Sequence, residues 1–142
     1  MDRPVAMQAF NNAIETEKPD FETFFLARFL DLRFAYPENT CVVTFELKDF
    51  MFNPQGSLHG GIIATALDIS MGHLLKHVQG PGTTLEMKTQ YVKAARQGTV
   101  TCKGEFTRRG RTVSFLKSTM VDDQDQVIAF ATATWMQLKS AS

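Results

Sequence analysis

Several features that mark other classes of protein are missing from this sequence. The two cysteines, Cys41 and Cys102, are too few for a disulfide framework and lack a CxxC spacing, so we interpret them as reduced core thiols of a cytoplasmic protein. No apolar run reaches the ~18 residues that a membrane span requires, and the first residues lack the apolar core of a signal peptide. Fifteen basic residues balance fifteen acidic ones, which argues against a general nucleic-acid-binding protein.

The composition that remains is that of one globular domain. The chain has 142 residues, of which 44% are hydrophobic and 21% are charged, and this is enough for a substantial core. Linkers, repeats and low-complexity tracts are absent. We therefore expect a single domain over residues 1–142, with a helical segment over 1–30 and the core over 31–139.

One stretch organises the sequence, a glycine-containing loop over 53–61 that leads into an apolar helical segment over 62–77. This helix is apolar on almost every side, which is typical of a buried helix. It contains one carboxylate, Asp68, and a buried carboxylate requires partners or a function. Small or polar residues share its face at helical spacing: Gly61, Ala64, Thr65 and Gly72. This face leaves room beside Asp68 for a ligand or another backbone.

The other patterns predict helices before this segment and strands around it. We expect a helix over 4–15, and a second helical run after Lys18-Pro19-Asp20 that carries Phe21, Phe24, Phe25, Phe29 and Leu32. Strands are expected over 32–36 and 40–47, and four more follow Gly82 in a period-two pattern. Because short turns join these four strands, we predict an antiparallel meander. The predicted fold class is α+β, one antiparallel sheet wrapped around a long central helix, with extra N-terminal helices.

The spacing of Asn53, Gly56, His59-Gly60-Gly61 and Asp68 before a run of strands resembles that of the hotdog-fold acyl-CoA thioesterases, in particular the PaaI-like branch. Asn53 lies six residues before His59, and Asp68 lies nine residues after it. Further matching pieces are Gly82-Thr83-Thr84 leading to Tyr91, Gly110-Arg111-Thr112, and a final strand that begins at Val127. The similarity covers roughly residues 50–138.

The resemblance implies an enzyme that hydrolyses a thioester at the start of the central helix. The free N–H groups and the positive dipole end of that helix can polarise a carbonyl, and glycine lets the oxygen approach closely. By resemblance, Gly60 supplies this N–H, with His59 and Gly61 beside it as substrate-binding residues. Asp68 is implied as the catalytic carboxylate, either as a general base that activates water or as a nucleophile.

Two further residues are expected in the catalytic group. Asn53 either holds the water or the carbonyl through its amide, or it merely starts the Asn-Pro turn. Thr84 matches the water-positioning hydroxyl of the family. Thr83 competes for this role, and the choice matters because neighbouring strand residues face opposite ways.

Charged and imidazole side chains offer weaker signals. Arg108, Arg109 and Arg111 cluster at a predicted turn, where they either bind the phosphates of coenzyme A or are merely solvated. His73 and His77 have the spacing of a metal pair, but no third ligand is evident. We interpret them as helix-end histidines favoured by the dipole, and we expect no metal site. We expect no cofactor, and coenzyme A enters only as part of the substrate.

The resemblance also implies a homo-oligomer, a dimer or tetramer in which Asp68 acts on a thioester held by Gly60 of the partner. The size of the acyl group and the choice between coenzyme A and acyl carrier protein stay open. Two alternative functions also stay open, a hotdog enoyl-thioester hydratase or dehydratase that uses His59, and a non-catalytic acyl-CoA-binding or sensing protein.

Overall fold

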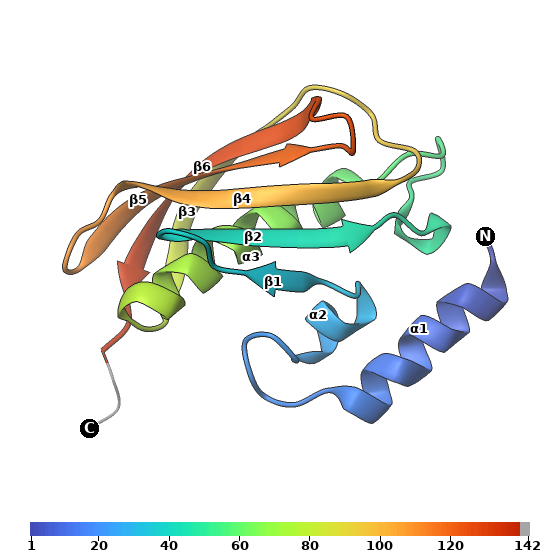
Figure 1. Ribbon diagram of the computed structural model, residues 1–142, viewed down its shortest axis with the longest axis horizontal. Coiled ribbons are helices and arrows are strands. Elements are labelled where there is room, and N and C mark those ends of the chain that lie inside the picture. The colour runs from blue at the N-terminus through green and yellow to red at the C-terminus, as the bar shows by residue number, and fades with distance from the viewer. Residues whose placement is uncertain (140–142) are drawn as a thin grey trace.

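The computed structural model describes residues 1–139, which form one sheet, one long helix and two shorter N-terminal helices (Figure 1). The α-helices are α1 (Arg3–Thr16), α2 (Phe25–Phe29) and α3 (Gly60–Gln79). The strands are β1 (Arg33–Ala35), β2 (Thr40–Glu46), β3 (Gly82–Tyr91), β4 (Thr99–Arg108), β5 (Val113–Val121) and β6 (Val127–Gln137). A short 3-10 helix, η1 (Asp49–Met51), precedes the loop that leads into α3.

The sheet has the strand order β1-β2-β4-β5-β6-β3, and all neighbouring strands are antiparallel. In the central strands, alternate side chains point inward and are buried, as in β5, where Ser114, Leu116, Ser118 and Met120 alternate with exposed or half-buried residues. Helix α3 lies against this inner face, and α1 and α2 lie beyond β1 (Figure 1). The predicted α+β architecture, a sheet wrapped around a central helix, is confirmed.

Helix α3 begins and ends where its sequence dictates. His59 caps its first turn through the side chain, and Gly80 ends it with φ +107°, a left-handed conformation that glycine adopts without strain. The helix approaches the sheet closely at Gly104, where an added Cβ would lie 2.5 Å from the Ser70 carbonyl oxygen. Nearby, the buried hydroxyls of Ser70 and Ser118 share a hydrogen bond of 2.6 Å. The helix is therefore locked to β4 and β5 near its middle.

The predicted four-stranded meander is wrong in one connection. Strands β4, β5 and β6 are consecutive neighbours, but β3 pairs with β6 at the far edge rather than with β4. The connection over 92–98, yellow in Figure 1, crosses to β4, and its Ala95 carbonyl accepts a hydrogen bond from the Leu58 N–H. The connection packs against the loop before α3. The sequence predicts a short turn here, whereas the structure has a connection that crosses the end of the sheet.

The second N-terminal helix is shorter than predicted. Only Phe25–Phe29 are α-helical, and the residues from Pro19 to Phe24 form a turn. The turn directs Phe21 and Phe24 to the ring of His73 on α3, with centroid distances of 5.2 and 6.0 Å. The phenylalanine spacing therefore reflects packing on the central helix and not a continuous helix of its own.

Both cysteines are fully buried free thiols on neighbouring strands, as predicted for core residues. Burial raises the pKa of the Cys41 thiol to about 12 and raises the pKa of the Cys102 thiol as well. Over residues 1–139, no helix combines the length and apolar character needed to cross a membrane.

Candidate active site

Asp68 and Thr84 form the centre of the candidate site. The Thr84 hydroxyl donates a hydrogen bond of 2.8 Å to Oδ1 of Asp68, and both residues are half-buried. Thr84 therefore faces the helix. Thr83 is exposed and pairs with Met136, an exposed residue of β6, so it lies on the outer face. Of the two threonines left open by the sequence, Thr84 is the one beside the carboxylate.

Burial raises the pKa of the Asp68 carboxyl above its usual range, and the hydrogen bond from Thr84 opposes part of this shift. Burial disfavours the charged form, whereas a donated hydrogen bond stabilises it. A carboxylate in this state is a better proton acceptor than one in water, which suits a general base.

A β-bulge in β3 directs Thr84 toward the helix. The register with β6 shifts between Thr84 and Glu86, so that Leu85 is an extra residue and is exposed. After the bulge, Met87 is half-buried and Glu86 is exposed. The period-two pattern predicts that Leu85 and Met87 lie on the same face of the sheet, but the bulge places them on opposite faces. Bulges of this kind often occur next to active sites, where they re-aim a side chain.

The start of α3 offers one backbone donor. The Gly61 N–H donates to Nδ1 of His59 over 2.8 Å, and is therefore already used by the cap. Among residues 1–139 the Gly60 N–H has no hydrogen-bond partner. The hydroxyl of Tyr91, at the end of β3, donates to the Gly60 carbonyl over 3.0 Å and ties the helix start to the edge strand. The period-two pattern alone did not indicate this contact of Tyr91.

Gly60 and Asp68 of one chain are too far apart to act on the same carbonyl. Eight residues separate them on a continuous helix, which corresponds to about 12 Å along the axis at 1.5 Å per residue. A thioester carbonyl that accepts from the Gly60 N–H is therefore out of reach of Asp68 in the same chain.

Asn53 organises its own loop. Its Oδ1 accepts hydrogen bonds from the N–H groups of Gln55 and Ser57, at 3.0 and 3.2 Å, and its Nδ2 donates to the Ser57 hydroxyl over 3.1 Å. Gly56 in the same loop has φ +81°. The turn-forming role of Asn53 is therefore present, and its predicted contact with water or substrate stays a prediction.

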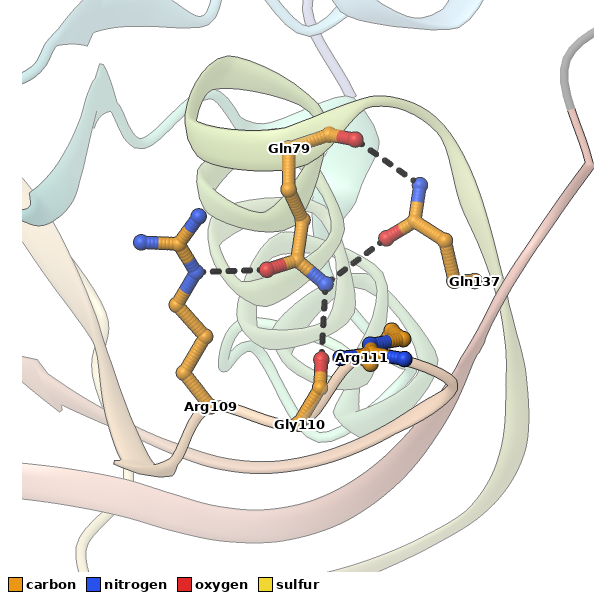
Figure 2. Close-up of a pocket in the computed structure, with 5 residues that line it drawn as sticks. All are labelled: Gln79, Arg109, Gly110, Arg111 and Gln137. Carbon is orange, nitrogen blue, oxygen red and sulfur yellow. Dashed lines mark hydrogen bonds between the residues drawn. The ribbon is translucent and has the colours of Figure 1, made fainter.

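Two of the three arginines line a cavity at the far end of α3, shown in Figure 2. The cavity measures about 460 Å³, and its lining residues are Gln79, Arg109, Gly110, Arg111 and Gln137. Arg108 does not line it. Because Gln79 follows Asp68 by eleven residues on the helix, the cavity lies about 17 Å from Asp68 along the axis.

A network of glutamines holds Arg109 in this cavity. Nε of Arg109 donates to Oε1 of Gln79 over 2.5 Å, and the Gln79 amide donates to the Gly110 carbonyl and to Oε1 of Gln137. The terminal nitrogens of Arg109 point away from Gln79 (Figure 2). A guanidinium has five N–H donors, and over residues 1–139 only Nε of Arg109 is used, so its terminal N–H groups can donate to an anion.

Of the two helix histidines, only His73 differs from the interpretation as a helix-end histidine favoured by the dipole, because His77 lies in the last turn of α3. His73 is 4% exposed and packs against Phe21, Phe24 and Phe34, and burial lowers its pKa to about 4. It is therefore a neutral core residue, because an apolar environment disfavours the imidazolium more than the helix end favours it. His77 is exposed and stacks on Tyr36 at 4.2 Å. No cluster of three metal-binding side chains occurs over residues 1–139.

The sequence also failed to indicate the position of Trp135. This residue of β6 is the direct neighbour of Thr84 in the sheet and is 6% exposed. A Cβ added to Gly72 would lie 2.4 Å from Cη2 of its indole, so the ring rests on the helix one turn after Asp68. Only the pairing of β3 with β6 brings Trp135 to the site, and that pairing is not visible in the sequence pattern.

Comparison with known proteins identifies the family. The family model described as "Thioesterase superfamily" matches residues 55–129, which is more than half of the chain. The chain therefore belongs to the thioesterase superfamily. The curated "Putative esterase SSO2140" of Saccharolobus solfataricus is 29% identical over 116 residues, which cover 80% of this chain and 83% of that protein.

Solved structures confirm the fold. The BH2602 protein of Bacillus halodurans, solved with CoA, matches with a TM-score of 0.86 at 21% identity, over 98% of this chain and 94% of that chain. The Escherichia coli PaaI protein from the phenylacetic acid degradation operon matches with a TM-score of 0.80 at 18% identity, over 95% and 96% of the two chains. The predicted PaaI-like hotdog fold is therefore confirmed.

Proposed function

We propose that this protein is an acyl-CoA thioesterase, which hydrolyses an acyl-CoA to a free acid and CoA. The observation that carries this proposal is the hydrogen bond between Thr84 and Asp68, which holds a half-buried carboxylate of raised pKa on a helix face of small residues. Membership of the thioesterase superfamily supports the reaction class. The CoA solved with BH2602, a protein of the same fold, supports the thioester carrier. The proposed hydrolysis uses no cofactor, and CoA takes part only as the carrier of the substrate.

Gly60 is the residue that polarises the thioester carbonyl. Its N–H lies at the positive end of α3 and is not used by the His59 cap, so it can donate to the oxyanion that develops during attack. Tyr91 fixes the position of this turn through the Gly60 carbonyl. The donor is therefore preorganised before substrate binds.

Asp68 acts by one of two routes. As a general base it takes a proton from water while the water oxygen attacks the carbonyl carbon, and the C–S bond then breaks to release the CoA thiolate, which is protonated. As a nucleophile its own oxygen attacks that carbon and expels the thiolate, and water then hydrolyses the mixed anhydride. In both routes the carboxyl must be ionised, and Thr84 stabilises that form.

A complete site requires two chains. Since about 12 Å of helix separates Gly60 from Asp68, we assign the two roles to different subunits of a homodimer, with Asp68 of one chain facing the partner's helix start. Strand β3 supports this arrangement. It is a ten-residue edge strand next to the site, and an unpaired edge is a ready template for a second copy.

Arg109 and Arg111 are the proposed contacts for the phosphates of CoA. Both line the cavity at the end of α3, and the terminal nitrogens of Arg109 remain available for a bidentate contact. Arg108 lies outside the cavity and serves as a matched control, because an Arg108→Ala variant should leave the KM for acyl-CoA unchanged while Arg109→Ala raises it.

The geometry favours hydrolysis over hydration of an enoyl thioester. A hydratase of this fold would pair His59 with an acid, but Nδ1 of His59 already accepts the Gly61 N–H over 2.8 Å as the cap of α3, which leaves it unavailable as a proton acceptor. An enoyl-CoA included in the substrate panel tests this directly, through loss of the enoyl absorbance without release of thiol.

The test is release of free thiol from a panel of acyl-CoAs by the wild type and by Asp68→Asn. We expect turnover of at least one acyl-CoA by the wild type and none by the variant. If the wild type binds acyl-CoA saturably and releases no thiol, the protein is a binding or sensing module and the proposed function is rejected.

A further inference from the structure

Trp135 fills the space on one side of Asp68. Gly72 follows Asp68 by one helical turn on the same face, and a Cβ there would lie 2.4 Å from Cη2 and 3.0 Å from Cζ3 of the indole. Trp135 is 6% exposed and is the direct cross-strand neighbour of Thr84. No room for a substrate group remains between the helix and the sheet at this point.

The space between the sheet and the next turn of the helix is also filled. A Cβ added to Gly82 would lie 2.3 Å from Cδ2 of Leu75 and 2.8 Å from the Met136 carbonyl oxygen. Gly82 is the first residue of β3, and Met136 is its near neighbour on β6. From Gly72 to the end of α3, the helix therefore packs directly on the β3–β6 pair.

In a single chain, the helix face on the opposite side of Asp68 is less covered. Gly61 is exposed, and Ala64 and Thr65 are half-buried, although all three share the small-residue face with Asp68. The space beside the carboxylate is thus blocked by an aromatic ring on its C-terminal side and accessible on its N-terminal side. The reacting carbonyl carbon of a thioester carries two substituents, the acyl chain and the sulfur of the pantetheine arm. The blocked side of Asp68 accommodates only a small substituent.

We propose that Trp135 is the end wall of the acyl site and restricts this enzyme to short acyl groups. The inference rests on the proposed function and names its substrate class. Asp68 and Gly72 are separated by about 6 Å along the axis, so an acyl chain that extends from the reacting carbonyl toward the wall meets the indole after a few carbon atoms. The pantetheine arm leaves through the open side, so the Arg109 and Arg111 that meet its phosphates belong to the partner chain and not to the chain that supplies Asp68.

The experiment measures kcat/KM by thiol release for acetyl-, butyryl-, hexanoyl- and decanoyl-CoA. The wild type should prefer the shorter substrates. Trp135→Ala and the milder Trp135→Leu should raise the ratio of decanoyl-CoA to butyryl-CoA by about tenfold or more, the scale of effect that added methylenes have when a pocket accepts them. Adding Gly72→Ala to Trp135→Ala places a methyl in the vacated space and should lower this ratio again.

A control variant distinguishes a specific effect of Trp135 on the acyl site from a general loss of core packing. Phe45→Ala truncates another buried aromatic, 2% exposed, on β2, which is separated from β3 by three strands of the sheet. It should lower the melting temperature without changing the order of preference among the acyl-CoAs. The melting temperature of each Trp135 variant shows that the protein measured is folded.

Two results would overturn the inference and are distinguishable. If the wild type hydrolyses acyl-CoA and the folded Trp135→Leu variant keeps the same chain-length profile, Trp135 is not the wall and the proposed function stands. If the wild type releases no thiol from any of the four substrates or from the wider panel, the proposed function fails and the inference fails with it.

Discussion

The Thr84 hydroxyl donates a 2.8 Å hydrogen bond to Oδ1 of Asp68, which connects the edge strand β3 to the middle of α3. This bond fixes one oxygen of the carboxylate and stabilises its charged form against the effect of burial. The second oxygen, Oδ2, is the atom we assign to water or to the thioester carbon. Thr84 is therefore a positioning residue, and the chemistry belongs to Asp68.

Removing this hydroxyl should move the pH profile in a defined direction. Burial holds the pKa of Asp68 above its usual range and Thr84 lowers it, so Thr84→Val should raise it further. Because the active form is ionised, the acidic limb of kcat/KM should shift to higher pH, and we expect kcat/KM at neutral pH to fall by about tenfold, the value of one hydrogen bond to a charged group.

The neighbouring threonine provides the matched control for this experiment. Thr83 is exposed on the outer face, so Thr83→Val should leave both the pH profile and the rate at wild-type values. Thr84→Ser retains a hydroxyl and should restore most of the activity. Equal effects of the two valine variants would contradict the assigned role of Thr84.

Gly60 allows an unusually clean test of the oxyanion donor. Proline has no N–H and is well tolerated as the first residue of a helix, and the residue before it, His59, already has the extended conformation that proline requires, φ −62° and ψ 135°. Gly60→Pro should therefore lower kcat about 10²–10³-fold while the helix stays intact.

Gly60→Ala is the control, because it keeps the N–H and adds only a Cβ. That Cβ would lie 3.3 Å from the Tyr91 ring, and the exposed tyrosine can shift to accept it. We expect near-normal turnover for the alanine variant and circular dichroism like that of the wild type for both. Similar turnover in the two variants would show that the Gly60 N–H does not bind the oxyanion.

Mixing two inactive variants tests the shared site. After refolding together, Gly60→Pro and Asp68→Asn chains should form heterodimers in which one site combines an intact Gly60 with an intact Asp68, and activity should return. Neither variant alone should be active. A mixture that stays inactive, or a wild-type mass of one chain in solution at assay concentration, would contradict a site built from two subunits.

The sequence predicted the elements that depend on local pattern. The helix expected over 62–77 is observed as Gly60–Gln79, and the strands expected over 32–36 and 40–47 are Arg33–Ala35 and Thr40–Glu46. These agreements follow from caps, glycine breaks and alternation, which are local properties. Asp68 could likewise be identified because one carboxylate inside an apolar helix is conspicuous.

Long-range pairing could not be predicted. The partner of β3 is β6, and no local pattern distinguishes this from a meander. The bulge at Leu85 changes which face of the sheet the later residues of β3 point to. A simple alternation counted along the strand therefore cannot decide whether Thr83 or Thr84 faces the helix, and the structure was required. Trp135 joins the site only through the β3–β6 pairing. The neutral state of His73 depends on Phe21, Phe24 and Phe34, which lie far from it in sequence.

His73 should make the stability of the fold dependent on pH. Its pKa is lowered to about 4 from an ordinary value of 6.5, so the unfolded chain binds a proton that the folded chain does not. The free energy of unfolding should therefore fall as the pH decreases from 6.5 to 4, by about 3 kcal/mol in total, and be unaffected by this group above pH 6.5.

Urea unfolding of the wild type, His73→Leu and His77→Gln across this range checks the prediction. The His73→Leu variant should lose most of the slope between pH 6.5 and 4. His77→Gln is the control, because it replaces an exposed histidine of the same helix and leaves His73 in place, so the slope should remain. If the wild type and His73→Leu show parallel pH dependence, the histidine is not the cause.

The most direct measurement is the rate of thiol release from acyl-CoA by the wild type and by Asp68→Asn, with melting temperatures recorded for both. Asparagine has the same shape but neither accepts a proton nor attacks the thioester carbon, so the fold should survive and turnover should fall by at least about 10³-fold. A folded Asp68→Asn variant that retains near-wild-type turnover would contradict the assignment of Asp68 as the catalytic carboxylate.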